Sequence, residues 1–238
     1  MEINRNSIRS KVTMDLLSIQ FKWSCWFIPI VFLIYLCSVW FVPEVRERDI
    51  SFIAFSYEAS KIYMLVIGIM VFLAMFSHFM KFGVTRKDYF VGSALAAVAL
   101  SLFHIITSAI ITTVVGLSEA FSKDYHLSFI EPNTHLVVLI VTLSLTLISY
   151  YVAGWIIAIG FYRYGGLGGL GFIVIALVYI ALIDIFWGRE LLDTLSTNLP
   201  ITISQMPIYV SLFSTVILTG VGLLLIRNVT KRVRIKLE

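Results

Sequence analysis

Long apolar runs alternate with short polar segments along almost the whole chain. Each run is long enough for one helix to cross the hydrocarbon core of a bilayer, which takes about 20 residues. The runs are continuously apolar rather than alternating, which favours helices over the strands of a membrane barrel. The pattern therefore predicts an all-α membrane protein with six transmembrane helices, at Trp23–Val42, Ile62–Met80, Phe90–Gly116, His135–Tyr162, Gly165–Gly188 and Ile208–Ile226.

A different pattern precedes the first run. Apolar side chains recur there at every third or fourth position, which predicts an amphipathic helix with one apolar stripe. The helix either lies in the inner membrane interface, with its cations near anionic headgroups, or caps the bundle as a plain soluble helix. We favour the interfacial placement, because the segment runs straight into a membrane span. The stripe consists of Ile8, Val12, Leu16, Ile19 and Trp23.

The domain organisation follows from these patterns. Residues 1–22 form the amphipathic segment, residues 23–226 form one six-span transmembrane domain, and residues 227–238 form a basic tail. We find no internal repeat and no low-complexity tract.

Composition supports a membrane protein. The chain has 238 residues, of which 59% are hydrophobic and 13% are charged. A soluble domain carries about 45–50% apolar and about 25% charged residues. The net charge of +4 does not indicate nucleic-acid binding, because the basic residues lie in short segments between apolar runs, as topology-determining residues do.

The Lys and Arg residues gather on one side of the predicted membrane. That side carries 13 of them and the other side carries 5, so the positive-inside rule predicts that both termini are cytoplasmic. The 13 residues are Arg5, Arg9, Lys11, Lys22, Lys81, Arg86, Lys87, Arg163, Arg227, Lys231, Arg232, Arg234 and Lys236.

Three ionisable side chains fall inside the predicted spans, where such groups are costly and are candidates for function. His104 lies near mid-membrane, and we favour a neutral imidazole bonded to a Ser or Thr over a functional one. His78 lies close enough to the inner surface to be wetted. Asp184 lies near the outer end of its span, beside Trp187, where we expect it to face water. So few charges count against a proton- or ion-coupled carrier.

Small residues indicate a closely packed bundle. "GLGGLG", Gly166 to Gly171, matches a dinucleotide-binding pattern, but spans flank it and that pattern requires a preceding strand. We interpret it as a tight turn at Tyr162–Tyr164 followed by a helix whose small face lets another helix approach. Similar small-residue stripes are formed by Ser93, Ala97 and Ser101 and by Gly154 and Ala158.

Motifs of enzymes and metal sites are missing from the sequence. There is no H-E-x-x-H, no G-x-S-x-G and no Walker A motif, so this chain has no catalytic residues, metal site or cofactor that we can assign. Cys25 and Cys37 lie about 18 Å apart on one predicted helix. That is too far for a disulfide, and we interpret them as core residues.

The charged stretch from Lys81 to Phe90 joins the second and third predicted spans. Gly83 permits a sharp exit from the second span. Thr85 can cap a short helix beginning at Arg86, which would present charged side chains while Tyr89 and Phe90 stay near the bilayer. From these residues alone, a purely topology-determining loop is equally well supported.

"FGVTRKDYFVG", at 82–92, resembles the first cytoplasmic loop of type-2 ABC transporter permeases. The pattern is a Gly, a Ser or Thr, a basic pair and an aromatic residue. The six spans, the amphipathic start, the cytoplasmic ends and the length agree with that family. The matching residues are Gly83, Thr85, Arg86, Lys87, Tyr89 and Phe90.

The resemblance implies a non-enzymatic permease subunit of an exporter in the bacterial plasma membrane. The loop would be a coupling helix that docks on a separate ABC ATPase subunit, which binds ATP and Mg²⁺, and a second permease subunit would complete the path. The substrate would be an amphipathic peptide, antibiotic or lipid. The predicted partner-binding residues are Gly83, Thr85, Arg86, Lys87, Asp88, Tyr89 and Phe90.

Other interpretations stay open. A membrane sensor or immunity protein that holds a peptide in the bilayer is the main alternative, whereas an intramembrane enzyme lacks catalytic residues here. Family members carry re-entrant outer helices between the last two spans. Trp187 to Pro207 occupies that place, and its "RELLDTL" part predicts one short amphipathic helix. Homodimer or heterodimer and the direction of transport are not decided by the sequence.

Overall fold

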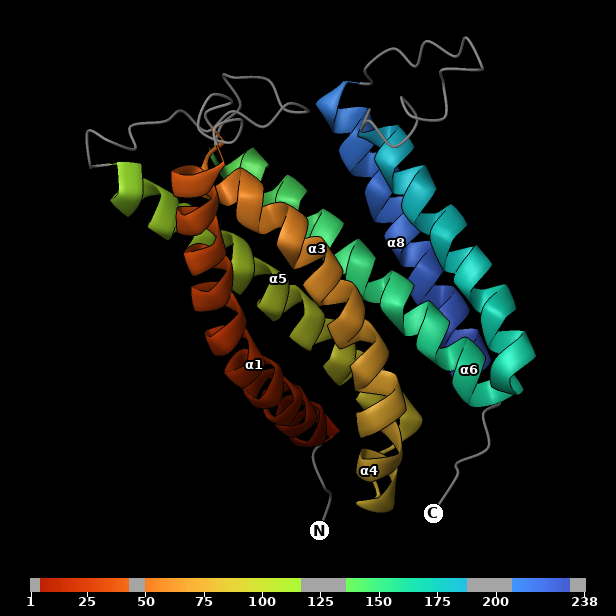
Figure 1. Cartoon of the computed structure of the whole chain (residues 1–238). Helices are drawn as coiled ribbons and strands as arrows, with labels where there is room; N and C mark the ends of the chain where they lie inside the picture. Colours follow the sequence, from red (N-terminus) through yellow and green to blue (C-terminus); the bar gives the residue numbers. More distant parts are fainter. Residues whose placement is uncertain (1–4, 43–49, 117–135, 188–206, 232–238) are drawn as a thin grey trace, which may run out of the picture.

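The described part of the protein is all helical. The computed structural model describes residues 5–42, 50–116, 136–187 and 207–231, and no strand occurs in them. The predicted re-entrant segment (188–206) and most of the basic tail (232–238) lie outside the described residues. The helices (Figure 1) are α1 (Arg5–Phe41), α3 (Phe52–Met70), the π-helix η1 (Val71–Met75), α4 (Phe76–Lys81), α5 (Arg86–Gly116), α6 (Leu136–Phe186) and α8 (Ile208–Thr230).

Five of the described helical segments are long and apolar enough to cross a membrane, by length and composition. Large apolar side chains such as Leu33, Val66 and Ile217 point outward along them, which suits a lipid environment and not water. These properties indicate a multi-pass membrane protein. The segments are Ile8–Phe41, Phe52–Lys81, Arg86–Gly116, Leu136–Phe186 and Ile208–Thr230.

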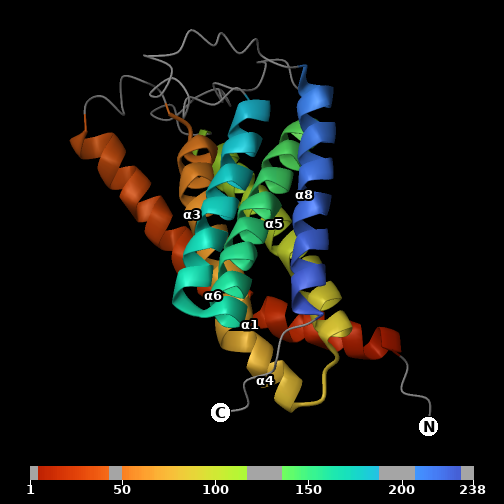
Figure 2. The ribbon, with the colours of Figure 1, turned by 90° about the vertical axis from the view of Figure 1, so that its right-hand side faces the viewer.

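The helix α6 contains both the fourth and the fifth predicted spans. Its 51 residues would extend about 77 Å if straight, but Gly165 has φ 73° and ψ −162° and breaks it. Two arms then run side by side in opposite directions (Figures 1 and 2). The predicted turn at Tyr162–Tyr164 therefore lies slightly later, at the residue that tolerates a positive φ.

The amphipathic segment and the first span form the single helix α1. Figure 2 shows the start of α1 lying across one end of the bundle before the helix rises along it. Val12 and Leu16 of the predicted stripe are buried in the main core, whereas Trp23 is exposed. The stripe thus packs on protein rather than on lipid. Placement of this segment in the membrane interface stays a prediction.

The helix α3 begins at Phe52, well before the predicted start at Ile62. It therefore includes a charged pair, Glu58 and Lys61, whose Oε2 and Nζ atoms are 2.5 Å apart. The Lys61 ammonium also lies 5.4 Å from the ring centroid of Tyr57 and 5.6 Å from that of Tyr150 on α6. The Glu58 carboxylate and the two rings stabilise the positive charge of Lys61. The helix therefore includes residues 52–61, which the sequence pattern had placed in a loop.

Two glycines allow α3 and the first arm of α6 to touch through their backbones. A Cβ atom at Gly68 would lie 2.1 Å from the carbonyl oxygen of Tyr151, and one at Gly154 would lie 2.0 Å from that of Leu65. Gly154 and Ala158 of the predicted small-residue stripe are both buried. Ser93, Ala97 and Ser101 of the other stripe are buried as well. The prediction of close packing is confirmed at these positions.

Replacement of Gly154 with alanine tests this contact. Gly154→Ala places a methyl group against the Leu65 carbonyl, and we expect it to lower the free energy of unfolding by about 1–3 kcal/mol. Gly220→Ala is the matched control, because a Cβ there meets nothing within 4 Å and alanine favours helix by roughly 0.5–1 kcal/mol. Thermal unfolding in detergent micelles measures both. Equal stability of the two variants would contradict the contact.

Candidate functional site

The predicted coupling loop lies at the end of the bundle that also holds the start of α1, the Gly165 turn and the last turn of α8 (Figures 1 and 2). Arg86 Nη1 donates to the carbonyl of Lys231 at 2.8 Å, and Arg163 Nη1 donates to that of Val229 at 2.9 Å. Segments predicted to share one side of the membrane are therefore in contact. Which side is cytoplasmic stays a prediction.

The loop itself is a short connection between two capped helix ends. Gly83 has φ +79°, its N–H donates to Met80 at 3.1 Å, and the Val84 N–H donates to Phe79 at 3.2 Å. This is a Schellman arrangement, in which a left-handed glycine ends the preceding helix. The prediction of a sharp exit at Gly83 is confirmed.

Thr85 caps the next helix, as predicted. Its Oγ1 accepts the N–H of Asp88 at 3.2 Å and donates to Asp88 Oδ2 at 2.6 Å. However, Arg86 begins the 31-residue α5 and not a separate short helix. The first turn of α5 therefore replaces the expected free-standing coupling helix, because no glycine or proline breaks the chain between Arg86 and Phe90.

The seven predicted partner-binding residues divide into an outward and an inward group. Gly83, Thr85 and Lys87 are exposed, and Arg86 and Phe90 are half-buried. The other two, Asp88 and Tyr89, point into the protein. A partner could thus contact only part of the predicted set.

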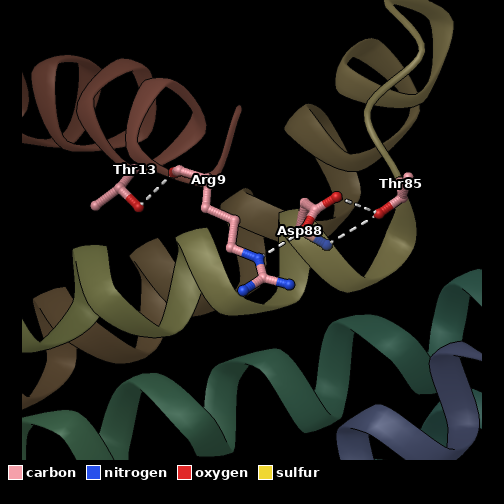
Figure 3. Close-up of polar contacts among 4 residues, drawn as sticks. All are labelled: Arg9, Thr13, Thr85 and Asp88. Carbon is pink, nitrogen blue, oxygen red and sulfur yellow. Dashed lines mark hydrogen bonds and ion pairs between the residues drawn. The ribbon is translucent and has the colours of Figure 1, made fainter. Parts of the chain in front are cut away.

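Asp88 is 2% exposed and joins the loop to the start of α1. The Nε of Arg9 lies 2.7 Å from its Oδ1, and Figure 3 shows the carboxylate between Arg9 and Thr85. Asp88 stands in the first turn of α5, where the helix dipole favours a negative charge. One carboxylate therefore binds the capping residue Thr85 and the start of α1.

Tyr89 connects the loop to the irregular part of the second span. Its hydroxyl donates to the carbonyl of Val71, the first residue of η1. Its ring packs against Phe76 and Phe79, at centroid distances of 5.4 and 5.5 Å. Single π-helical turns are rare and recur at functional sites, and this one is in direct contact with the loop.

Phe90 joins the same region to two further helices. The guanidinium of Arg227 on α8 lies 5.5 Å from the Phe90 ring centroid, and the Trp155 ring of α6 lies 5.4 Å from it. The first turn of α5 thus contacts α1, η1, α6 and α8.

Two strongly exposed apolar side chains at this end of the bundle were not predicted as site residues. Phe82 at the loop is 74% exposed, and Leu167 beside the Gly165 turn is 89% exposed. Phe82 stands between Lys81 and Gly83, so its position next to a turn glycine is the signal that could have identified it.

His104 is buried in a polar network within the bundle. Its Nε2 lies 2.9 Å from Ser24 Oγ and its Nδ1 lies 3.3 Å from Ser60 Oγ. Ser24 donates its single proton to the Gln20 carbonyl at 3.0 Å. Each ring nitrogen therefore has one serine hydroxyl as its hydrogen-bond partner, which is the kind of partner that we expected for His104. The neutral state of the imidazole stays a prediction.

The network reaches four helices. Tyr63 of α3 lies with its hydroxyl 2.8 Å from Ser24 Oγ on α1 and stacks on Phe27 at 4.3 Å. Gln20 Nε2 of α1 donates to the Tyr151 hydroxyl of α6 at 3.3 Å. With His104 on α5, these bonds join α1, α3, α5 and α6. The arrangement crosslinks these four helices through side-chain hydrogen bonds.

The other polar candidates do not join this network. His78 is exposed, as expected, and packs edge-on against Phe82 at 4.8 Å.

The expectation that Asp184 faces water is wrong, because its side chain is 2% exposed within the bundle. Cys25 and Cys37 are exposed and free, so they are not the core residues that we expected.

No family model, curated protein or solved structure matches this chain. The relation to ABC permeases therefore stays a resemblance of sequence pattern. Among the described residues, no group of three or more His, Cys, Asp or Glu side chains is placed to hold a metal ion.

Removal of Arg9 tests the role of Asp88. Arg9→Gln leaves the carboxylate without this cation in a buried position, and we expect a loss of about 1–3 kcal/mol in the free energy of unfolding. The double variant Arg9→Gln/Asp88→Asn lacks the buried charge and should be more stable than Arg9→Gln alone. Thermal unfolding in micelles compares them. If the double variant were less stable than both the wild type and Arg9→Gln, the result would argue against an ion pair between Arg9 and Asp88.

A double-mutant cycle tests the His104 network. Ser24→Ala and His104→Leu remove the same interhelical bond, and we expect a coupling energy of about 0.6 kcal/mol, with a ceiling near 1.7 kcal/mol. Reversible unfolding in mixed micelles gives the four stabilities. Strictly additive effects would show that the two side chains do not interact.

Proposed function

We propose that this chain is the membrane-spanning subunit of an ATP-driven ABC exporter. It crosses the bacterial plasma membrane six times, with both termini and the 81–90 loop in the cytoplasm. The two arms of α6, residues 136–164 and 166–186, serve as the fourth and fifth crossings. At 1.5 Å per residue they extend about 43 and 31 Å, which suffices for a hydrocarbon core of about 30 Å.

One observation carries the proposal. The loop exposes several side chains to a partner, while the residues that follow it are bonded to other helices of the bundle. Lys81, Phe82 and Lys87 are exposed, whereas Asp88 and Tyr89, which directly follow Lys87, are held by Arg9 and by the Val71 carbonyl. A ligand or partner shifts a conformational equilibrium only through contacts that differ between the states. A loop anchored to α1, η1 and α8 would pass such a difference to the spans.

The partner supplies the nucleotide chemistry. The sequence has no Walker A motif, so ATP and Mg²⁺ would be bound by a separate ATPase subunit. Phe82 suits the role of a buried aromatic anchor in that interface, and the neighbouring lysines suit its rim, because interface cores favour aromatic side chains over lysine. A second permease subunit would complete the translocation path.

An apolar groove supports an amphipathic substrate. It has a volume of about 360 Å³ between α1 and α5, which falls within the range of small-molecule sites, about 300–1,000 Å³. Its lining is wholly apolar and would take the apolar part of a peptide, antibiotic or lipid. The side chains that line it include Ile28, Phe32, Ile110, Ile111 and Val114.

Affinity purification of the tagged chain from its native membrane tests the proposal. We expect an ATPase subunit to co-purify, and we expect Phe82→Ala/Lys87→Glu to reduce its recovery about tenfold or more, the loss of roughly 1.4 kcal/mol. Lys22→Glu is the control, because Lys22 is an exposed cation of α1 outside the loop. Quantitative mass spectrometry measures the ratio of the two subunits.

Two results would go against this function. Recovery of an ATPase that is unaffected by the loop variant would place the interface elsewhere. Recovery of no ATPase by a folded, membrane-inserted chain would instead favour a sensor or immunity protein.

A further inference from the structure

A second groove lies between the start of α1 and the end of α4. Its volume is about 580 Å³, so it is the size of a small-molecule site and not of a folded partner. The floor is apolar and includes Val12, Phe79 and Val84, while Lys11, Asp15 and His78 also line it. Its lining includes Phe82 and Val84 beside the loop, and the start of α1 runs crosswise at this end of the bundle (Figure 2).

The two charges of this groove are available to a ligand. Lys11 and Asp15 are exposed, and neither forms an ion pair or a side-chain hydrogen bond with any other described residue. They stand four positions apart on α1, so they share one face with their Cβ atoms about 5–6 Å apart. The groove thus offers an ammonium and a carboxylate one helical turn apart above an apolar floor.

We propose that this groove binds one phospholipid with a zwitterionic, primary-amine headgroup of the ethanolamine class. The lipid phosphate lies at Lys11, its ammonium lies at Asp15, and one acyl chain lies on the partly exposed apolar lining of Ile8, Ile19 and Val84. The headgroup carries one charge of each sign, which complements the one lysine and the one aspartate of the groove. A glycerol headgroup offers Asp15 no cation, and a choline headgroup offers it no N–H donor.

The surroundings of the groove favour a lipid over other ligands. Met14 and Phe21 of α1, the helix that carries Lys11 and Asp15, are exposed apolar side chains. The interfacial placement that the sequence predicts for the start of α1 would put this groove at headgroup depth. The bilayer therefore supplies the ligand at high concentration. The site does not depend on transport or on an ATPase partner.

Native mass spectrometry of the delipidated full chain tests this site. Ethanolamine, glycerol and choline phospholipids with identical acyl chains are added in equal amounts. We expect one ethanolamine lipid to be retained about tenfold better than the others. Asp15→Asn should abolish the preference for ethanolamine over glycerol lipid, while Lys11→Gln should weaken retention of both. Lys22→Gln, which changes an exposed cation outside the groove, should leave retention unchanged.

A second measurement needs no variant. The ethanolamine lipid should raise the melting midpoint of the wild-type chain by at least about 2 °C more than the choline lipid does, because a ligand of the folded state stabilises it.

Several outcomes would overturn the proposal. These are equal retention of the three lipids, a preference for the glycerol lipid, an ethanolamine preference that survives both variants, or a dimer of the chain that excludes lipid.

Discussion

The backbone contact between α3 and the first arm of α6 is the constraint on which the bundle depends. Lipid tails are as apolar as the helix surfaces, so close packing and interhelical hydrogen bonds must hold the helices together. Gly68 and Gly154 allow each helix to lie against a carbonyl oxygen of the other. Most of α6 between Leu147 and Gly160 is buried as a result. The helices α5 and α8 also pack on α6, whereas α1 packs mainly on α5. The helix α8 contacts the first arm of α6 where Gly222 meets Val152, and α1 contacts that arm through Gln20 and Tyr151.

The sequence predicted the helices well because a membrane span requires a long apolar run, and that requirement is local. Predicted and observed helices disagree where a contact from a distant segment decides the outcome. From the sequence alone, the charge of Lys61 indicates a loop. In the structure its ammonium lies against the ring of Tyr150 on α6, and Lys61 is part of α3. The stripe of α1 looks like a lipid-facing surface, yet Val12 packs against the bundle, where a Cβ at Gly92 would lie only 2.7 Å from its Cγ1. In both cases the partner is far away in the sequence.

The loop shows the same division between local and distant effects. Gly83 and Thr85 were predictable, because a left-handed cap and a threonine N-cap are properties of the neighbouring residues. The inward placement of Asp88 and Tyr89 could not be predicted, since it depends on Arg9 and on the carbonyl of Val71 in the π-helical turn η1. Similarly, a hydroxyl partner for His104 was expected, but the sequence could not show that Ser24 and Ser60 come from two different helices.

The Arg9–Asp88 pair also imposes an order on biosynthesis. The two residues are separated by 79 positions, and a ribosome that adds about 5–20 residues per second needs roughly 4–16 s to make the intervening chain. Throughout that time the first turns of α1 lack the carboxylate that later fixes them. The ion pair that joins the start of α1 to the start of α5 can therefore form only after synthesis has passed Asp88, so it belongs to the later steps of folding.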